Sequence, residues 1–67
     1  MEMVPVNSSN IARVGYEGGT LYIEFHTGAV YQYFDVPENI HQDLMNASSQ
    51  GQYFASYIKG RFRFARV

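Results

Sequence analysis

The 67-residue sequence contains no cysteine and no tryptophan, and it has only two prolines. Without cysteine there is neither a disulfide nor a thiolate metal site, so the hydrophobic core must hold the fold alone. Apolar runs are far shorter than the roughly 20 residues of a membrane-spanning helix. The first residues show no basic stretch followed by an apolar one, as a secretory signal would. We therefore expect one cytoplasmic domain over residues 1–67, with no membrane as partner.

Aromatic residues are plentiful, with six Tyr and five Phe. Ordering a small domain costs about 1.5 kcal/mol per residue, which burial must offset. An aromatic side chain buries about 150–250 Å², more than most aliphatic ones. We interpret these residues first as core and only then as candidates for binding.

The net charge of −1 conceals an uneven distribution of charged residues. Arg13 is the only basic residue among residues 1–58, which hold all six acidic residues. Residues 59–67 carry four basic side chains and no acid. Two interpretations remain open: the two parts attract each other, within one chain or between two copies, or the basic end binds an anion.

Residues 11–26 have the pattern of a β-hairpin. Apolar and polar residues alternate over 11–17 and again over 20–26, and Gly18-Gly19 between them suits a two-residue loop with positive φ. Such a loop places all the apolar side chains on one face. The predicted cross-strand pairs are Tyr16 with Leu21, Val14 with Ile23, Ala12 with Phe25 and Arg13 with Glu24.

The next turn decides which face the following tyrosines occupy. A two-residue loop at 27–28 would turn Tyr31 and Tyr33 away from the core. A three-residue loop at 26–28 with Gly28 in the left-handed region turns both toward it, and glycine in the third position is what this loop needs. We predict the three-residue loop. The resulting pairs are Phe25 with Ala29, Ile23 with Tyr31 and Leu21 with Tyr33.

Two helices follow. Apolar residues recur at spacings of three and four from Pro37 to Ala47, with Pro37 at the first helical position. The Ser-x-x-Gln pattern that begins at Ser49 is a capping box, so a second helix starts there and ends at Gly60.

A final strand is predicted over residues 61–67, with Phe62 and Phe64 facing inward. Residues 3–6 allow a further short strand, at a sheet edge because Pro5 is tolerated only there. The fold class is thus α+β: a small antiparallel sheet in the order β-β-β-α-α-β, with both helices packed on one face.

Several short motifs occur along the chain. They are Val6-x-Ser8-Ser9-x-Ile11, Gly15-Tyr16, Leu21-x-x-x-Phe25-x-x-Gly28-x-x-Tyr31-x-Tyr33-x-x-Val36-Pro37, Leu44-Met45-x-Ala47-x-Ser49-x-Gly51 and Ile58-Lys59. Together they resemble the KTSC domain family, over residues 4 to 67. That family is known as a tail on some lysyl-tRNA synthetases and as short stand-alone bacterial and phage proteins. The resemblance implies no catalytic residues, and nucleic-acid binding is the role suggested for the family.

Catalytic and metal-binding patterns are absent. Glu38 and His41 lie three apart on a predicted helix, but two ligands fall short of a zinc site. Ser8-Ser9 is better explained by turn hydrogen bonds than as a nucleophile. A chain this short also leaves little room for a water-excluded pocket of about 300–1,000 Å³. We expect no enzyme activity, no cofactor and no metal.

The sheet face away from the helices is the expected binding surface, because it combines aromatic and basic residues. Two functions fit it: a protein-interaction or self-associating module that forms a homodimer or binds a protein partner, or a module that binds RNA or tRNA through the basic C-terminal strand. Arg61 and Arg63 join this face if the last strand pairs into the same sheet. The candidate binding residues for either function are Arg13, Tyr22, Phe34, Lys59, Arg61, Arg63 and Arg66.

Overall fold

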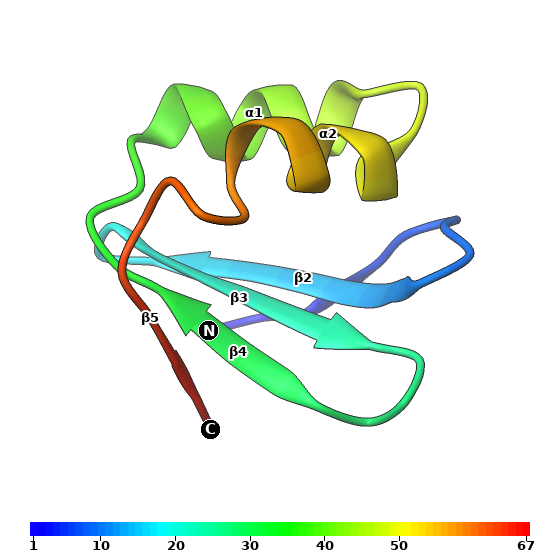
Figure 1. Ribbon diagram of the computed structural model, residues 1–67, viewed down its shortest axis with the longest axis horizontal. Coiled ribbons are helices and arrows are strands. Elements are labelled where there is room, and N and C mark those ends of the chain that lie inside the picture. Colours follow the sequence, from blue (N-terminus) through cyan, green and yellow to red (C-terminus); the bar gives the residue numbers. More distant parts are fainter.

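The computed structural model describes all 67 residues and consists of a five-stranded antiparallel sheet with both helices on one face (Figure 1). The predicted α+β class and element order are confirmed, and the additional short strand is present. The strands lie side by side in sequence order. The elements are β1 (Val4–Pro5), β2 (Ile11–Glu17), β3 (Thr20–Phe25), β4 (Val30–Tyr33), α1 (Glu38–Asn46), α2 (Gln50–Tyr57) and β5 (Phe64–Arg66).

Both predicted hairpin loops are confirmed. Gly18 and Gly19 have φ values of 58° and 82°, and Gly28 has a φ of 96°. The Phe25 N–H donates to the Ala29 oxygen at 2.9 Å across the three-residue loop. The registers follow the prediction, with Tyr16 opposite Leu21, Val14 opposite Ile23, Arg13 opposite Glu24, Ile23 opposite Tyr31 and Leu21 opposite Tyr33.

One predicted pair is wrong. Phe25 lies opposite Ile11, not Ala12, because a β-bulge interrupts β2 between Ile11 and Arg13. Ile11 is fully buried, whereas Ala12 is half-buried. An isoleucine side chain removes more apolar area from water than an alanine methyl group, so the bulge serves the core.

The helices begin close to the predicted positions. Pro37 is the N-cap of α1, one position before the predicted place, because its ψ of 151° is extended. Ser49 caps α2 as predicted, and its Oγ accepts a hydrogen bond from the Gln52 N–H at 3.2 Å. Gly60, with a φ of 77°, follows the end of α2.

The core lies between the sheet and the two helices. It takes its buried side chains from β2, β3, β4, both helices, the segment before α1 and the residue that follows α2. No helix in the structure is long and apolar enough to span a membrane. The nine residues of this core are Ile11, Val14, Leu21, Ile23, Tyr33, Val36, Leu44, Phe54 and Ile58.

The predicted last strand is shorter than expected. β5 spans only residues 64–66, and the Arg61 N–H instead donates to the Ile58 oxygen at 3.0 Å in a turn. Phe62 packs against the core as predicted, but Phe64 is 59% exposed. Phe64 does face the helix side of the sheet, opposite Tyr33, yet it sits on an edge strand with one neighbouring strand.

Candidate functional site

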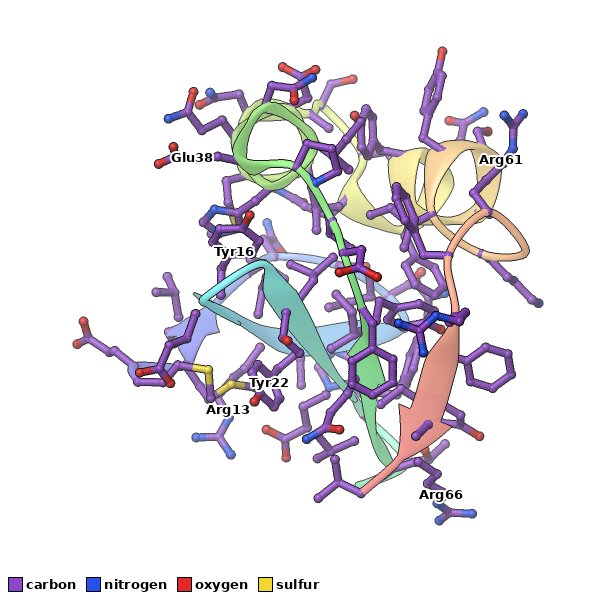
Figure 2. All side chains as sticks on the ribbon, turned by 90° about the vertical axis from the view of Figure 1, so that its left-hand side faces the viewer. Arg13, Tyr16, Tyr22, Glu38, Arg61 and Arg66 are labelled. Carbon is purple, nitrogen blue, oxygen red and sulfur yellow. The ribbon has the colours of Figure 1, made fainter.

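The sheet face away from the helices is partly covered by the N-terminal segment. A Cβ atom on Gly15 would lie 2.6 Å from the Met3 Sδ and 2.9 Å from the Met1 Sδ, so the thioethers pack directly on this glycine. Figure 2 shows two sulfur atoms beneath the sheet, beside Tyr22 and Arg13. The exposed part of this expected binding surface is therefore smaller than the alternation of residues alone predicts.

Two of the candidate basic residues already have acidic partners. Arg13 forms an ion pair with Glu24, which raises the pKa of the guanidinium through a hydrogen bond and its charge. Arg63 forms an ion pair with Asp35 at 3.0 Å, and its guanidinium carbon lies 5.3 Å from the centroid of the Phe34 ring. This second pair joins the basic end to the acidic part of the same chain.

The candidate residues do not gather on one surface. Arg13 and Tyr22 lie on the face opposite the helices, whereas Arg61 lies beside α2 and Arg66 at the far end of β5 (Figure 2). Arg66 pairs with Tyr31 in the register of β4 and β5, so it points to the helix side. The expectation that Arg61 and Arg63 join the open face through a last strand is wrong for Arg61, which lies in the preceding turn.

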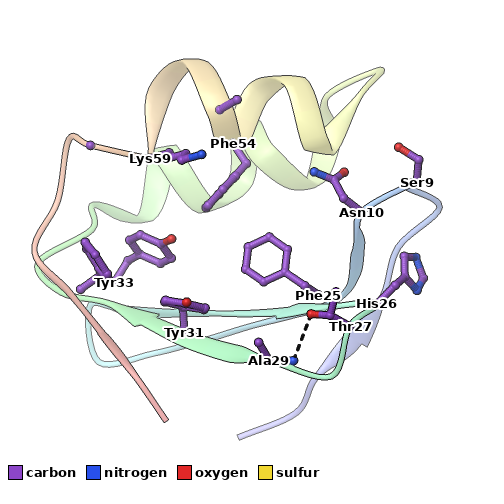
Figure 3. A pocket seen from close by; sticks show the side chains of 13 residues that line it. Ser9, Asn10, Phe25, His26, Thr27, Ala29, Tyr31, Tyr33, Phe54 and Lys59 are labelled. Carbon is purple, nitrogen blue, oxygen red and sulfur yellow. Dashed lines mark hydrogen bonds between the residues drawn. The ribbon is translucent and has the colours of Figure 1, made fainter.

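A groove of about 770 Å³ opens on the helix side instead, between α2 and strands β4 and β5 (Figure 3). The groove is open to solvent because α2 leaves the helix-side face of β5 uncovered. It therefore does not test the prediction that so short a chain has little room for a water-excluded pocket. The groove is lined by Ser9, Asn10, Phe25, His26, Thr27, Ala29, Tyr31, Tyr33, Phe54, Ala55, Lys59, Gly60 and Phe64.

Aromatic rings form the walls of the groove. Phe54 projects from α2 and contacts two rings of the sheet edge to face. Its ring centroid lies 5.6 Å from that of Phe25 and 5.5 Å from that of Tyr33. Phe64 lies 5.9 Å from Tyr31 and 5.8 Å from Tyr33. Burial and then the neighbouring Tyr31 raise the pKa of Tyr33, so its hydroxyl stays a neutral hydrogen-bond donor.

The end of the groove that Ser9, Asn10 and His26 line is polar, and hydrogen bonds stabilise the short loop that forms it. The Ser8 Oγ donates to Asn10 Oδ1 at 3.1 Å and accepts the Ile11 N–H at 3.2 Å. The His26 Nε2 lies 2.9 Å from the Ser8 carbonyl oxygen. These contacts agree with the prediction that Ser8 serves the turn.

Phe64 separates the groove from a second, shallower hollow of about 600 Å³. This hollow contains two arginines beside three phenylalanines. It is lined by Phe34, Gly60, Arg61, Phe62, Arg63 and Phe64. Phe64 thus stands exposed between two depressions.

The histidine on α1 packs against a tyrosine of β2. The His41 ring stacks on Tyr16, with centroids 4.6 Å apart and planes 7° from parallel. Burial lowers the pKa of His41, although the nearby Glu38 carboxylate opposes the shift. No group of three or more His, Asp or Glu side chains lies close enough to hold a metal ion.

The groove itself was missed by reasoning from the sequence. The signal was available, because the predicted alternation already places Tyr31, Tyr33 and Phe64 on one face of the sheet. Phe54 is the only large aromatic side chain that α2 buries against them. One helix of that length leaves part of such an aromatic face open.

Comparison with protein families gives one match of high coverage. The model of the KTSC domain matches residues 7–62. A crystal structure of a KTSC domain protein from Yersinia pestis is 40% identical, with a TM-score of 0.94, and the match covers 98% of this chain and 96% of that one.

Curated relatives fall into two groups. A lysine–tRNA ligase of Nostoc punctiforme is 52% identical over 48 residues, which is 72% of this chain but only 9% of the ligase. A lysine–tRNA ligase of Trichormus variabilis is 48% identical over the same length, again 9% of the ligase. A Tsukamurella paurometabola protein is 40% identical over 63 residues, covering 91% of this chain and 94% of that protein.

Proposed function

Because this chain belongs to the KTSC domain family, whose function is not established, we propose that it is a non-catalytic module that binds a segment of another protein in its aromatic groove. The observation that carries the proposal is the exposure of Phe64. A large aromatic side chain that is 59% exposed at the mouth of an aromatic groove has the character of an interface anchor.

The composition of the groove supports the same proposal. Tyr and Phe are enriched in protein interfaces. Four aromatic residues of the sheet line the groove together with Phe54 of α2: Phe25, Tyr31, Tyr33 and Phe64. Lys59 adds one charged group at the end of α2. The lining offers no acid–base pair: His26, its only imidazole, is directed to the Ser8 carbonyl oxygen.

Selection from a display library of random peptides tests this function. Peptides enriched on the wild-type protein are expected to lose binding to Phe64→Ser. Tyr57→Ser is the matched control, because Tyr57 is 55% exposed on α2 but does not line the groove. The proposal fails if no peptide is enriched, or if both variants bind the selected peptides equally well.

RNA binding is a second candidate function, and the relatives give it specific support. Three ligases named for a tRNA substrate contain a region similar to this chain. Lys59, Arg61 and Arg66 form no salt bridge. Lys59 lines the groove (Figure 3), Arg61 lies beside α2 (Figure 2), and Arg66 points to the helix side of the sheet. These side chains are the ones available for phosphate groups.

Fluorescence anisotropy with labelled single-stranded RNA and tRNA tests this candidate. Three phosphate contacts to a single strand would give a log–log salt slope of roughly −2 between about 50 and 200 mM salt. Arg61→Glu combined with Arg66→Glu would then remove most of the binding. Absence of binding at the lower salt concentration excludes the candidate.

A further inference from the structure

The outer edge of β5 is a free strand edge. The Phe34 N–H donates to the Arg63 oxygen at 2.9 Å, and the Val67 N–H donates to the Val30 oxygen at 2.9 Å. Residues 63, 65 and 67 therefore turn their backbone groups toward β4, since these groups alternate along an antiparallel strand. The N–H and C=O groups of Phe64 and Arg66 point outward, with no strand beside them.

The opposite edge of the sheet does not offer the same groups. The Val6 N–H donates to the Ala12 oxygen at 3.1 Å, so the alternation turns Pro5 outward. Proline has no N–H, and the outward position of β1 therefore lacks a donor. A strand from another chain finds an unblocked edge only at β5.

Phe64 belongs both to the free edge of β5 and to the lining of the groove. Phe64 directs its backbone outward and its side chain into the groove lining. A strand added along β5 would place every second side chain on the helix side of the sheet. The side chain opposite Phe64 would then enter the mouth of the groove and contact its aromatic walls.

The charges near the groove favour a negatively charged partner. No acidic residue is among those that line the groove, and Lys59 is. Arg66 points to the same side of the sheet, two residues beyond Phe64. An incoming strand with a carboxylate two residues from its apolar side chain would complement Arg66.

From these features we propose that the groove takes an extended, acidic peptide segment, which pairs with β5 as a sixth strand and places an apolar side chain beside Phe64. This inference rests on the proposed function, because it names the conformation and charge of the protein segment. Main-chain hydrogen bonds to Phe64 and Arg66 supply affinity, and alternate side chains supply specificity.

The probe is the set of peptides selected from a random library about ten residues long, the upper length of an ordinary strand. We expect the enriched sequences to alternate apolar and acidic residues. Each nitrogen of the tightest peptide is then methylated in turn, and affinity is measured by fluorescence anisotropy. Methylation at every second residue should abolish binding, whereas methylation at the residues between should be tolerated, because only alternate N–H groups face β5.

Two pairs of protein variants test the edge and the charge. Arg66→Pro and Arg66→Gln both remove the positive charge, but only Arg66→Pro also removes the outward N–H. The proline variant should therefore bind the selected peptide about tenfold more weakly than the glutamine variant. Lys59→Gln and Gln42→Glu each lower the net charge by one, and Gln42 lies exposed on α1, outside the groove. Only Lys59→Gln should weaken binding of the acidic peptide. The amide NMR spectrum of each variant establishes that the fold is retained.

The outcomes separate the two proposals. Selected peptides that need Phe64 but show no alternation on methylation, or carry basic instead of acidic residues, overturn the extended acidic occupant and leave the proposed function standing. Failure to select any peptide removes the proposed function itself. A concentration-dependent dimer that Arg66→Pro abolishes would identify a second copy as the occupant and would equally overturn this inference.

Discussion

Tyr16 connects the sheet to the first helix through both ends of its side chain. Its hydroxyl donates to the Val36 carbonyl oxygen at 2.5 Å, in the segment before α1, and its ring stacks on His41 of that helix. The stack needs no charge on the imidazole, and burial favours the neutral form. One tyrosine thus places α1 over β2.

The protein should therefore lose stability in mild acid. The pKa of His41 is lowered in the folded state from its ordinary 6.5, so the unfolded chain takes up the proton first as the pH falls through that value. Denaturant unfolding at about pH 7.5 and about pH 5.5 should give a lower free energy of unfolding at the acidic pH. His41→Phe keeps the ring and removes the titration, so its pH-dependent loss should be smaller. An equal loss in both proteins would contradict this account.

Gly28 is required by its backbone conformation rather than by its surroundings. Its φ is 96°, and a Cβ atom there would meet nothing within 4 Å. Gly28→Val should cost about 1–3 kcal/mol, since a β-branched residue resists positive φ. Gly28→Asn should cost less, because asparagine tolerates this region better. Thermal unfolding checks both, and equal midpoints for the two variants would argue against backbone strain as the cause.

At the scale of elements, the first turn of α2 is held against the loop before β2. A Cβ atom on Gly51 would lie 2.5 Å from Asn10 Oδ1 and 3.3 Å from the Ser8 Oγ. The helix therefore approaches the loop as closely as it does because residue 51 has no side chain. This contact supports the polar end of the groove.

Gly51→Ala should consequently lower stability, although alanine in a helix is ordinarily about 1 kcal/mol better than glycine. In an Asn10→Ala background the obstructing amide is gone, and the same substitution should become neutral or stabilising. A double-mutant cycle by denaturant unfolding should give a coupling of about 0.5–3 kcal/mol between the two positions. Additive effects would mean that the loop moves aside freely.

The strand registers were predictable because two independent features agree in each hairpin. Alternation defines a face, and the turn glycines allow only one pairing that keeps this face apolar, as for Gly28 and Tyr33. The bulge near Ile11 was not predictable in the same way. Ile11 and Ala12 are both apolar, so alternation alone does not decide which of them the core takes.

At the scale of the whole molecule, the two phenylalanines that α2 and β5 bring to one groove have very different burial. Phe54 is 5% exposed beneath α2, whereas Phe64 is 59% exposed on the edge strand. Phe54→Ala should cost about 3–5 kcal/mol, a large part of the stability of a small domain. Phe64→Ala should cost about 1 kcal/mol or less, because only its ring contacts with two tyrosines are lost.

Denaturant unfolding of the two variants measures this difference directly. Similar losses for Phe54→Ala and Phe64→Ala would mean that β5 is as much a part of the core as α2 is. A much smaller loss for Phe64→Ala fits a residue that is kept for contact with a partner.

The candidate site was less predictable than the fold for a physical reason. Charge and aromatic content identify residue types, but they do not say which side chains the fold brings together. Arg63 pairs with Asp35, which is distant in sequence, and Arg66 turns to the helix side because β5 pairs with β4 in one particular register. Such pairings between distant segments leave no periodic signal in the sequence.

The proline on the outer edge of β1 limits which assemblies this protein can form with copies of itself. A sheet that accepted strands at both edges would let copies join one after another into a fibre. With Pro5 turned outward, β1 lacks an N–H donor at this position, so edge pairing between copies is favoured only as a closed pair joined through their two β5 strands. A peptide on β5 occupies that same edge, so the expected stoichiometry is one peptide per chain, and a chain that has bound its peptide cannot polymerise.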